Sequence, residues 1–226
     1  MRLYVLSIGG SLVAPDQIDV EFLKKMKAVL DKQIESGARF VIVVGGGGAA
    51  RKYQRALKEF GAANAALDQI GIAATRLNAE LVRLVLSPLA GSKIFVEPDV
   101  VEFDDAPILI GGGWKPGWST DYVAVFLAKK FGADSVVNLS NIEYVCDKDP
   151  NKFVDAKPIK NISWADFKKI VGGEWTPGAN LPFDPIASKF AEENDIAVAV
   201  MNGDNIENYL DGEEFVGTKI GGEVNG

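Results

Sequence analysis

Three glycine-rich turns are the segments of this chain whose composition most clearly indicates chemistry. They cover residues 8–11, 44–48 and 110–113, and each follows a short apolar run. Glycine lets a backbone approach a ligand closely and turn several N–H groups toward it. Three such turns therefore predict a site for one large anionic ligand, or for two anionic ligands placed end to end.

The side chains available for catalysis are limited in kind. The chain has no histidine and a single cysteine, Cys146. The lack of histidine excludes Ser-His-Asp and Cys-His catalysis and His-ligated zinc. One cysteine excludes an internal disulfide and a thiolate metal cluster within the chain. Any catalysis must therefore use carboxylates, lysine, arginine, backbone amides or metal ions.

Charge and hydropathy narrow the class of protein. The net charge is −7, and no dense block of lysine and arginine occurs, which disfavours a nucleic-acid partner. Apolar residues make up 47% of the chain, yet no apolar run approaches the ~20 residues of a membrane span. The first residues lead directly into a strand pattern without a signal-peptide layout. We therefore expect a cytoplasmic protein with no membrane partner.

The elements that must position the turns follow from the hydrophobic pattern. Buried strands are predicted at 3–8, 40–44, 107–110, 135–139 and 197–201, with a further strand at 93–97. Helical spacing follows most of these strands and predicts helices at 23–34, 49–60, 65–86 and 185–194. One further helix is predicted to end at residue 131, and a short one to begin near residue 164. Expected helix caps are Asp19, Ser119 or Thr120, Ser163, and Asp184 before Pro185.

This alternation of strands and helices predicts the fold class. It indicates an α/β three-layer α/β/α sandwich with a mainly parallel central sheet. Parallel strands share one carboxyl edge, so all three glycine turns are expected to face one crevice. Residues 172–182 are predicted to be a loop, and no low-complexity linker occurs. We therefore predict a single domain spanning residues 1–226.

Several side chains near the turns allow two readings from the pattern alone. Arg51 can fork onto phosphate oxygens at a helix start, or it can be a solvated charge, which is the better interpretation for Lys52 and Arg55. Asp68 can be a buried acceptor or a helix cap. Residues 45–50 satisfy G-x-G-x-x-A, but the acid expected to end the next strand is missing, since Asp68 falls in a helical stretch.

Longer segments resemble a known family. Residues 45–53, 68–79, 112–121, 140–145, 149–150, 184–187 and 217–220 resemble, in the same order, the uridylate (UMP) kinases of the archaeal type. These enzymes belong to the amino acid kinase superfamily. The resemblance runs along essentially the whole chain, so it is far more specific than any one glycine turn. It implies an amino acid kinase-like fold whose N-terminal part binds UMP and whose C-terminal part binds ATP.

The resemblance also implies roles for individual residues. Residues expected to bind ATP are Ser7, Ile8, Gly9, Gly10, Ser11, Gly47, Arg51, Ser140, Asn141, Cys146 and Asp149. Residues expected to bind UMP are Gly46, Asp68, Trp114, Lys115, Pro116, Gly117, Trp118, Ser119 and Thr120. Asp184 and Arg51 are the expected catalytic residues. No protein side chain is assigned as a metal ligand, because Mg²⁺ entering with ATP retains waters and needs few protein ligands.

The chain departs from the family pattern at three positions. Ser7 stands where many superfamily members have a lysine that offsets charge on the transferred phosphoryl group, although some archaeal-type kinases also lack it. Glu143-Tyr144 replaces the usual Asp-Gly, and Cys146 replaces a common aromatic residue. Tyr144 then either stacks on adenine or packs in the ordinary way. The candidates to replace the lysine are Arg51, Lys115, Lys148, Lys189 and Mg²⁺.

The resemblance implies transfer of the ATP γ-phosphoryl group to UMP, giving UDP and ADP in pyrimidine nucleotide biosynthesis. Two alternatives remain. One is another small-acceptor kinase of the superfamily, such as isopentenyl phosphate kinase, which uses a histidine near the acceptor that this chain lacks. The other is a non-catalytic nucleotide-binding or storage protein, which the absent lysine keeps open. Kinases of this kind are typically hexamers built from dimers, so a homohexamer is expected by resemblance.

Overall fold

The computed structural model describes residues 2–172 and 181–222. The apolar runs form five of the strands of its large sheet. These are β1 (Leu3–Ile8), β2 (Arg39–Val44), β3 (Ile108–Gly111), β4 (Ser135–Ser140) and β8 (Ala197–Asn202). Nearly every residue in them is buried, as expected for strands covered on both faces.

The order of the strands creates a crevice. The seven-stranded sheet runs β3-β2-β1-β4-β8-β9-β7, and the first five strands are parallel. β9 (Gly217–Ile220) is antiparallel to β8 and parallel to β7 (Asn161–Ile162). The chain builds outward from β1 on one side and then returns to add β4 on the other. In open α/β sheets a ligand crevice forms at such a reversal, beyond the carboxyl ends of the strands.

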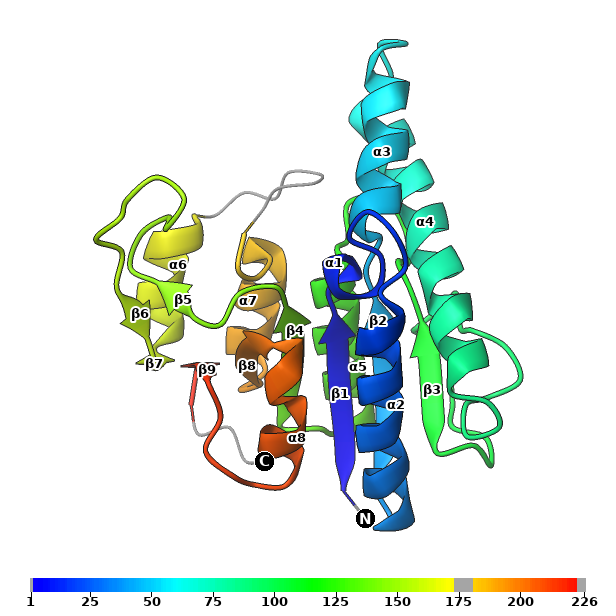
Figure 1. Ribbon diagram of the computed structural model, residues 1–226. Coiled ribbons are helices and arrows are strands. Elements are labelled where there is room, and N and C mark those ends of the chain that lie inside the picture. Colours follow the sequence, from blue (N-terminus) through cyan, green and yellow to red (C-terminus); the bar gives the residue numbers. More distant parts are fainter. Residues whose placement is uncertain (1, 173–180, 223–226) are drawn as a thin grey trace.

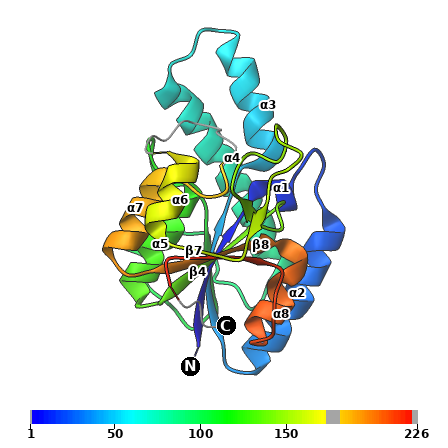
Figure 2. The same cartoon turned by 90° about the vertical axis from the view of Figure 1, so that its left-hand side faces the viewer.

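Two layers of helices cover the sheet (Figure 1, Figure 2). α2 (Val20–Glu35), α4 (Asn64–Val85) and α8 (Ile206–Leu210) pack on one face, and α5 (Thr120–Phe131), α6 (Trp164–Val171) and α7 (Pro185–Glu193) pack on the other. Alternate residues of each strand enter the two cores. In β1, for example, Leu6 enters one core and Val5 the other. The predicted α/β/α sandwich with a mainly parallel sheet is confirmed.

The expected caps fix where four helices begin. Asp19 accepts a hydrogen bond from Phe22 N at 2.9 Å and starts α2. Ser119 accepts from Tyr122 N and starts α5, so Ser119 is the cap and Thr120 is the first helical residue. Ser163 and Asp184 cap α6 and α7 in the same way. Each cap satisfies an N–H group that the helix itself cannot pair.

The region between the second glycine turn and α4 projects beyond the sheet. α3 (Gly47–Lys58) pairs with the first half of α4, and Figure 1 shows the two helices rising past the carboxyl ends of the strands. The helical turn α1 (Gly10–Val13) lies below them. None of the helices in the described residues is both long and apolar enough to cross a membrane.

A second, smaller sheet lies at the opposite end of the crevice. β5 (Val145–Cys146) and β6 (Pro158–Ile159) form an antiparallel pair, and the chain continues through β7 into α6. A short 3-10 turn, η1 (Gly203–Asn205), joins β8 to α8. These short strands carry little hydrophobic periodicity, and the pattern alone did not identify them.

Some sequence predictions need correction. Residues 93–97 do not form a strand: Phe95 makes a single bridge to Gly111, with one hydrogen bond from Phe95 N to Ile110 O. Pro98 has no N–H to extend the ladder, and the phenyl ring of Phe95 occupies the space that a Gly111 side chain would fill. α3 starts two residues before the predicted 49–60. The loop predicted at 172–182 lies largely outside the described residues.

Candidate active site

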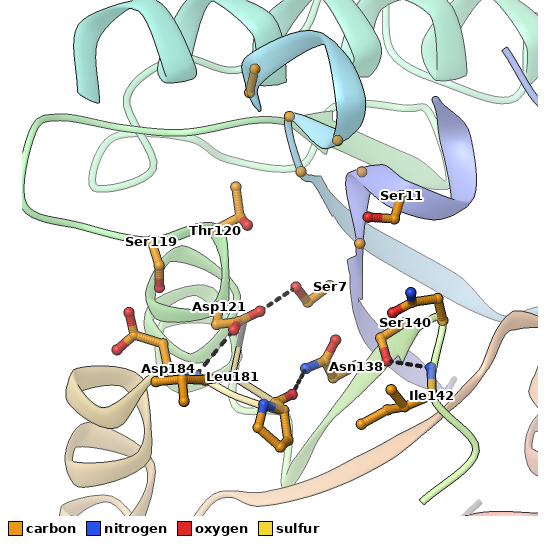
Figure 3. A pocket seen from close by; sticks show the side chains of 18 of the residues that line it. Ser7, Ser11, Ser119, Thr120, Asp121, Asn138, Ser140, Ile142, Leu181 and Asp184 are labelled. Atoms are coloured by element: carbon orange, nitrogen blue, oxygen red, sulfur yellow. Dashed lines mark hydrogen bonds between the residues drawn. The ribbon is translucent and has the colours of Figure 1, made fainter. Parts of the chain in front are cut away.

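The three glycine turns open into one cavity of about 650 Å³ at the carboxyl edge of the sheet. The first turn contributes Gly9 and Gly10, the second contributes Gly45–Gly47, and the third contributes Gly113. Side chains from β1, β4, α5 and α7 meet in the middle of this cavity (Figure 3). The expectation of a shared crevice is therefore confirmed.

The backbones of the first two turns touch each other. A Cβ atom added to Gly10 would lie 2.1 Å from the nitrogen of Gly47 and 2.5 Å from the carbonyl carbon of Gly45. Any larger residue at position 10 would therefore separate the turns. Gly45 N also donates to Ile8 O at 2.8 Å, so adjacent parallel strands end in one continuous layer of backbone. Such a layer can offer several N–H groups to an anion.

The third turn is bound to the side of α4. Gly113 N donates to Thr75 Oγ1 at 2.7 Å, while the same hydroxyl donates to Ile72 O. The guanidinium of Arg76 donates to Gly113 O at 3.2 Å and to Trp114 O at 3.0 Å. Side chains of α4 therefore hold one N–H group and two carbonyl groups of this turn in place.

Asp68 adds another contact between α4 and the loop that follows the third turn. Its Oδ2 accepts a hydrogen bond from Gly117 N at 2.9 Å. Asp68 lies inside α4, whose N-cap is Ala63, so the cap reading is wrong. Asp68 is an acceptor as predicted, but it is half-buried and not buried. Further along the loop, Trp114 Nε1 donates to Glu97, and the Lys115 ammonium lies 4.0 Å above the Trp114 ring.

Three helices of more than two turns begin at the cavity. α3 starts at Gly47, α5 starts at Thr120, and α7 starts at Pro185, and a lining residue lies at each start. The free N–H groups of a helix start carry partial positive charge, which favours phosphate oxygens nearby. The cavity is therefore suited to polyanions even though the whole chain carries a net charge of −7.

Two carboxylates meet between the ends of the cavity. Asp121 Oδ1 accepts a hydrogen bond from Ser7 Oγ at 2.9 Å, and its Oδ2 accepts from the backbone N–H of Asp184 at 3.2 Å (Figure 3). Asp184 is 5% exposed, and its Oδ1 accepts from Ala187 N. Asp184 Oδ2 is buried without a hydrogen-bond partner in the described part of the chain. A buried carboxylate oxygen of this kind is available to a cation or to a donor from a ligand.

The surroundings of these carboxylates raise both of their pKa values. Burial and the nearby charge of Asp184 raise the pKa of Asp121 to about 7, against the hydrogen bonds from Ser7 and the Asp184 backbone, which lower it. Burial likewise raises the pKa of Asp184, and the hydrogen bond from Ala187 N and the nearby Ser119 hydroxyl oppose that rise. Without a ligand, this pair of acids therefore disfavours carrying two negative charges.

The cations at the cavity differ in how they are paired. Arg51 is exposed and donates to Ser11 Oγ at 3.3 Å. Lys148 pairs with Asp155, and Lys152 pairs with Asp149. Among the lining residues that the structure describes, Arg51 is thus the cation without a carboxylate partner. Lys115 and Lys189, two of the candidates to replace the absent lysine, are not part of the lining.

The other end of the cavity is formed by β4 and the small sheet. Ser140 caps the turn after β4 by accepting from Ile142 N at 3.2 Å. Tyr144 and Cys146 line the cavity on either side of Val145, which is fully buried. Burial, and to a smaller extent Asp147, raise the pKa of the Cys146 thiol. Apolar side chains beside polar backbone at this end suit the flat ring of a base.

The structure brings most of the predicted site residues to the cavity. Those that line it are Ser7, Gly9, Gly10, Ser11, Gly46, Gly47, Arg51, Asp68, Trp118, Ser119, Thr120, Ser140, Asn141, Cys146, Asp149 and Asp184. Five predicted residues do not line it in the described structure. Ile8 is fully buried in the sheet, and Trp114, Lys115, Pro116 and Gly117 form the outer part of the loop.

Sequence reasoning assigned no role to Asp121, Asn138 or Thr75, which also line the cavity. Asp121 is in the first turn of α5, where an acidic residue usually interacts with the helix start. Asn138 lies within a buried apolar strand, and its amide donates to Pro182 O at 3.2 Å. A polar residue inside such a strand was the one available signal for it.

Comparison with known proteins gives a consistent result. Residues 2–202 match the sequence pattern of the Amino acid kinase family. The uridylate kinase of Methanobrevibacter smithii is 35% identical over 224 residues, covering 96% of this chain and 97% of that protein. The uridylate kinase of Sulfurisphaera tokodaii is 34% identical over 211 residues, covering 92% of each. The crystal structure of uridylate kinase from Archaeoglobus fulgidus has a TM-score of 0.78 at 31% identity, covering 97% of this chain and 100% of that chain.

Proposed function

Because the chain belongs to the amino acid kinase family, we propose that it is a UMP kinase, which transfers the γ-phosphoryl group of ATP to UMP and yields UDP and ADP. The observation that carries the proposal is the single cavity to which three amide-rich turns and three helix starts contribute. One small anion needs few N–H donors. A triphosphate and a monophosphate brought together need many, and three turns with three helix starts can supply them.

The two ends of the cavity differ in a way that supports an assignment of the substrates. UMP binds toward α3, α4 and the loop 113–120, which come from the N-terminal part of the chain. Asp68 takes the uridine ribose, and Trp118, Ser119 and Thr120 face the base and phosphate. ATP binds across the first turn toward β4 and the small sheet, from the C-terminal part, where Ser140, Asn141, Cys146 and Asp149 surround the nucleoside.

Phosphoryl transfer needs positioning and neutralisation of charge more than it needs a protein nucleophile. The UMP phosphate is ionised at neutral pH, so no strong general base is required. Arg51 lies on α3, directly after the second glycine turn, and donates to Ser11 of the first turn. From this position it neutralises charge between the two phosphates. In this proposal Arg51 supplies the positive charge that many members of the superfamily supply with a lysine at the position of Ser7.

The carboxylates fit a divalent cation that enters with ATP. Mg²⁺ is commonly bound by one or two carboxylates together with phosphate oxygens and water. Asp184 Oδ2 is the buried oxygen without a partner, so Asp184 would contribute the protein ligand, with Asp121 beside it. The described residues contain no cluster of three or more potential metal ligands. Mg²⁺ would supply neutralisation of the negative charge on the phosphates.

We further propose that the protein assembles as a homohexamer in the cytoplasm and serves pyrimidine nucleotide biosynthesis. Exposed apolar side chains on α4 support an assembly through that helix. Leu77 and Leu84, which lie seven residues apart on one helix face, are 66% and 58% exposed. A chain with one cysteine also suits a reducing compartment.

Release of ADP, measured with and without UMP, tests the proposed activity. We expect UMP-dependent turnover with ATP and Mg²⁺, and a much higher kcat/KM for UMP than for CMP, AMP or isopentenyl phosphate. Turnover with isopentenyl phosphate but not with UMP would favour the other small-acceptor kinase. Tight nucleotide binding without turnover on any acceptor would favour a binding protein and contradict the proposal.

A further inference from the structure

We propose that the buried hydroxyl of Thr218 positions the wall of the cavity that receives the base of the donor nucleotide. Thr218 lies on β9, behind the cavity, and is fully buried. Its Oγ1 accepts a hydrogen bond from Val145 N at 2.8 Å and donates one to Ile159 O at 2.6 Å. The inference rests on the proposed function, because that function identifies the wall as the donor site.

The two hydrogen bonds join the small sheet to the large one. Val145 belongs to β5 and Ile159 to β6, whereas Thr218 is opposite Val200 of β8 in the large sheet. β6 has a second attachment, because Lys219 N donates to Lys160 O just beyond it. For β5, the bond to Thr218 is the hydrogen bond that reaches the large sheet within residues 2–172 and 181–222.

The attachment point lies between two residues of the cavity wall. Tyr144 and Cys146 flank Val145, and both line the cavity. Val145 packs into the core, whereas both of its neighbours face the cavity. A shift of the Val145 backbone therefore moves both lining residues together. Thr218 itself does not line the cavity, so it is a positioning residue and not a ligand-binding one.

Removal of the hydroxyl alone tests this role. Thr218→Val keeps the size and branching of the side chain but removes the hydroxyl that accepts from Val145 N and donates to Ile159 O, so this residue no longer holds either strand to β9. Thr218→Ser keeps the hydroxyl. A role limited to general stability would instead change all kinetic parameters to a similar extent, or change only the melting temperature.

The first experiment compares steady-state kinetics of the full-length wild type, Thr218→Val and Thr218→Ser. Loss of the two bonds in Thr218→Val is expected to raise the KM for ATP about five- to tenfold. The KM for UMP and kcat are expected to stay close to wild type, and Thr218→Ser is expected to restore the KM for ATP. The control is Ser135→Ala, which removes a hydroxyl at the opposite end of β4, away from the cavity.

The second experiment uses Cys146, the one cysteine in the chain, as a probe of β5. The rate of thiol labelling is measured with and without ATP under non-denaturing conditions. Thr218→Val is expected to label faster than wild type and to need about five- to tenfold more ATP for half-protection, matching its KM. If Thr218→Val does not fold, Thr218→Ala tests the same two hydrogen bonds, because the smaller side chain adds no steric conflict.

Two results would overturn the inference. One is a Thr218→Val protein with wild-type KM for ATP and wild-type labelling, and the other is an equal change in the constants of both substrates. Failure of the proposed function would look different: wild type itself would show no UMP-dependent turnover. The labelling experiment would still report whether Thr218 positions β5.

Discussion

The two ends of the cavity, which we propose bind the acceptor and the donor, are built in different ways. At the acceptor end, one long helix binds the loop through three of its side chains: Asp68 accepts from Gly117, Thr75 accepts from Gly113, and Arg76 donates to two carbonyls. At the donor end, a two-stranded sheet of two residues per strand is joined to the main sheet through Thr218 and the neighbouring backbone.

This difference indicates which substrate the fold recognises more strictly. A loop with several side-chain contacts to a rigid helix keeps one shape before the ligand arrives, and a site formed in advance discriminates between similar ligands. A short sheet with few anchors adapts more readily to its ligand. We therefore expect strict selection of the acceptor base and more tolerance for the donor base.

The largest effect is expected where the two ends meet. Asp184→Asn removes the buried charge but keeps an oxygen that can cap α7. We predict a fall in kcat of about 10²- to 10³-fold, the size typical of a preorganised electrostatic group. The KM values for both substrates change much less. Steady-state kinetics with saturating Mg²⁺ measures this.

Asp19→Asn is the matched control for Asp184→Asn. Asp19 caps α2 with the same geometry, since it accepts from the N–H three residues ahead, but it does not line the cavity. It should lower the melting temperature as much as Asp184→Asn does, or more, without an effect on kcat. A similar loss of activity in both variants would mean that Asp184 acts only through capping.

Arg51→Ala is expected to have the next largest effect. The guanidinium joins α3 to Ser11 of the first turn, so its removal should lower kcat/KM for both substrates by about 10²-fold, equivalent to roughly 2–3 kcal/mol of charged hydrogen bonding. Arg55→Ala, one turn further along α3 and also exposed, is the control. Near-normal rates for Arg51→Ala would remove Arg51 from the site.

Arg76→Met tests whether the two ends of the cavity bind their substrates independently. It removes the donors to Gly113 O and Trp114 O while retaining an unbranched side chain. We predict a KM for UMP that is about tenfold higher, a KM for ATP close to wild type, and weaker discrimination against CMP. Arg83→Met, on the same helix but paired with Glu80, should change neither constant. Equal shifts for both substrates would contradict separate construction of the two ends.

The last prediction concerns stability and pH in the nucleotide-free protein, and it does not involve activity. The pKa of Asp121 is about 7 in the folded chain and 3.8 as the reference value, so between these values the folded state binds more protons than the unfolded state. The contribution of Asp121 to the stability of the wild type must therefore fall as pH rises from 4 to 7. In Asp121→Asn this loss, up to a few kcal/mol, is absent. Urea unfolding at several pH values measures the difference, and parallel profiles for the two proteins would refute it.

Local chemistry made much of the fold predictable. Continuous apolar runs identified the five parallel strands, and capping side chains located the starts of α2, α5, α6 and α7. The expected strand at 93–97 was wrong, because β propensity there competes with Pro98 and with the packing of Phe95 on Gly111. The strands β5, β6 and β7 have two residues each, so they have no period to detect.

The candidate site was predictable only in part. Glycine turns identified the cavity, because their residue type is required by close backbone contact, as between Gly10 and Gly47. The roles of Asp121 and Thr218 depend on partners 114 and 73 residues away in sequence, Ser7 and Val145. No local pattern encodes such contacts. The identity of the substrates came from resemblance to relatives, since amides and carboxylates alone suit many phosphates.

The central claim is that one cavity holds both nucleotides with their phosphates adjacent. A bisubstrate compound, in which adenosine and uridine are joined 5′ to 5′ through a polyphosphate, tests it directly. We predict that this compound competes with both ATP and UMP, and that it binds more tightly than either nucleotide because one molecule occupies both ends. Competition with only one substrate, or affinity no better than that of ATP, would contradict the claim.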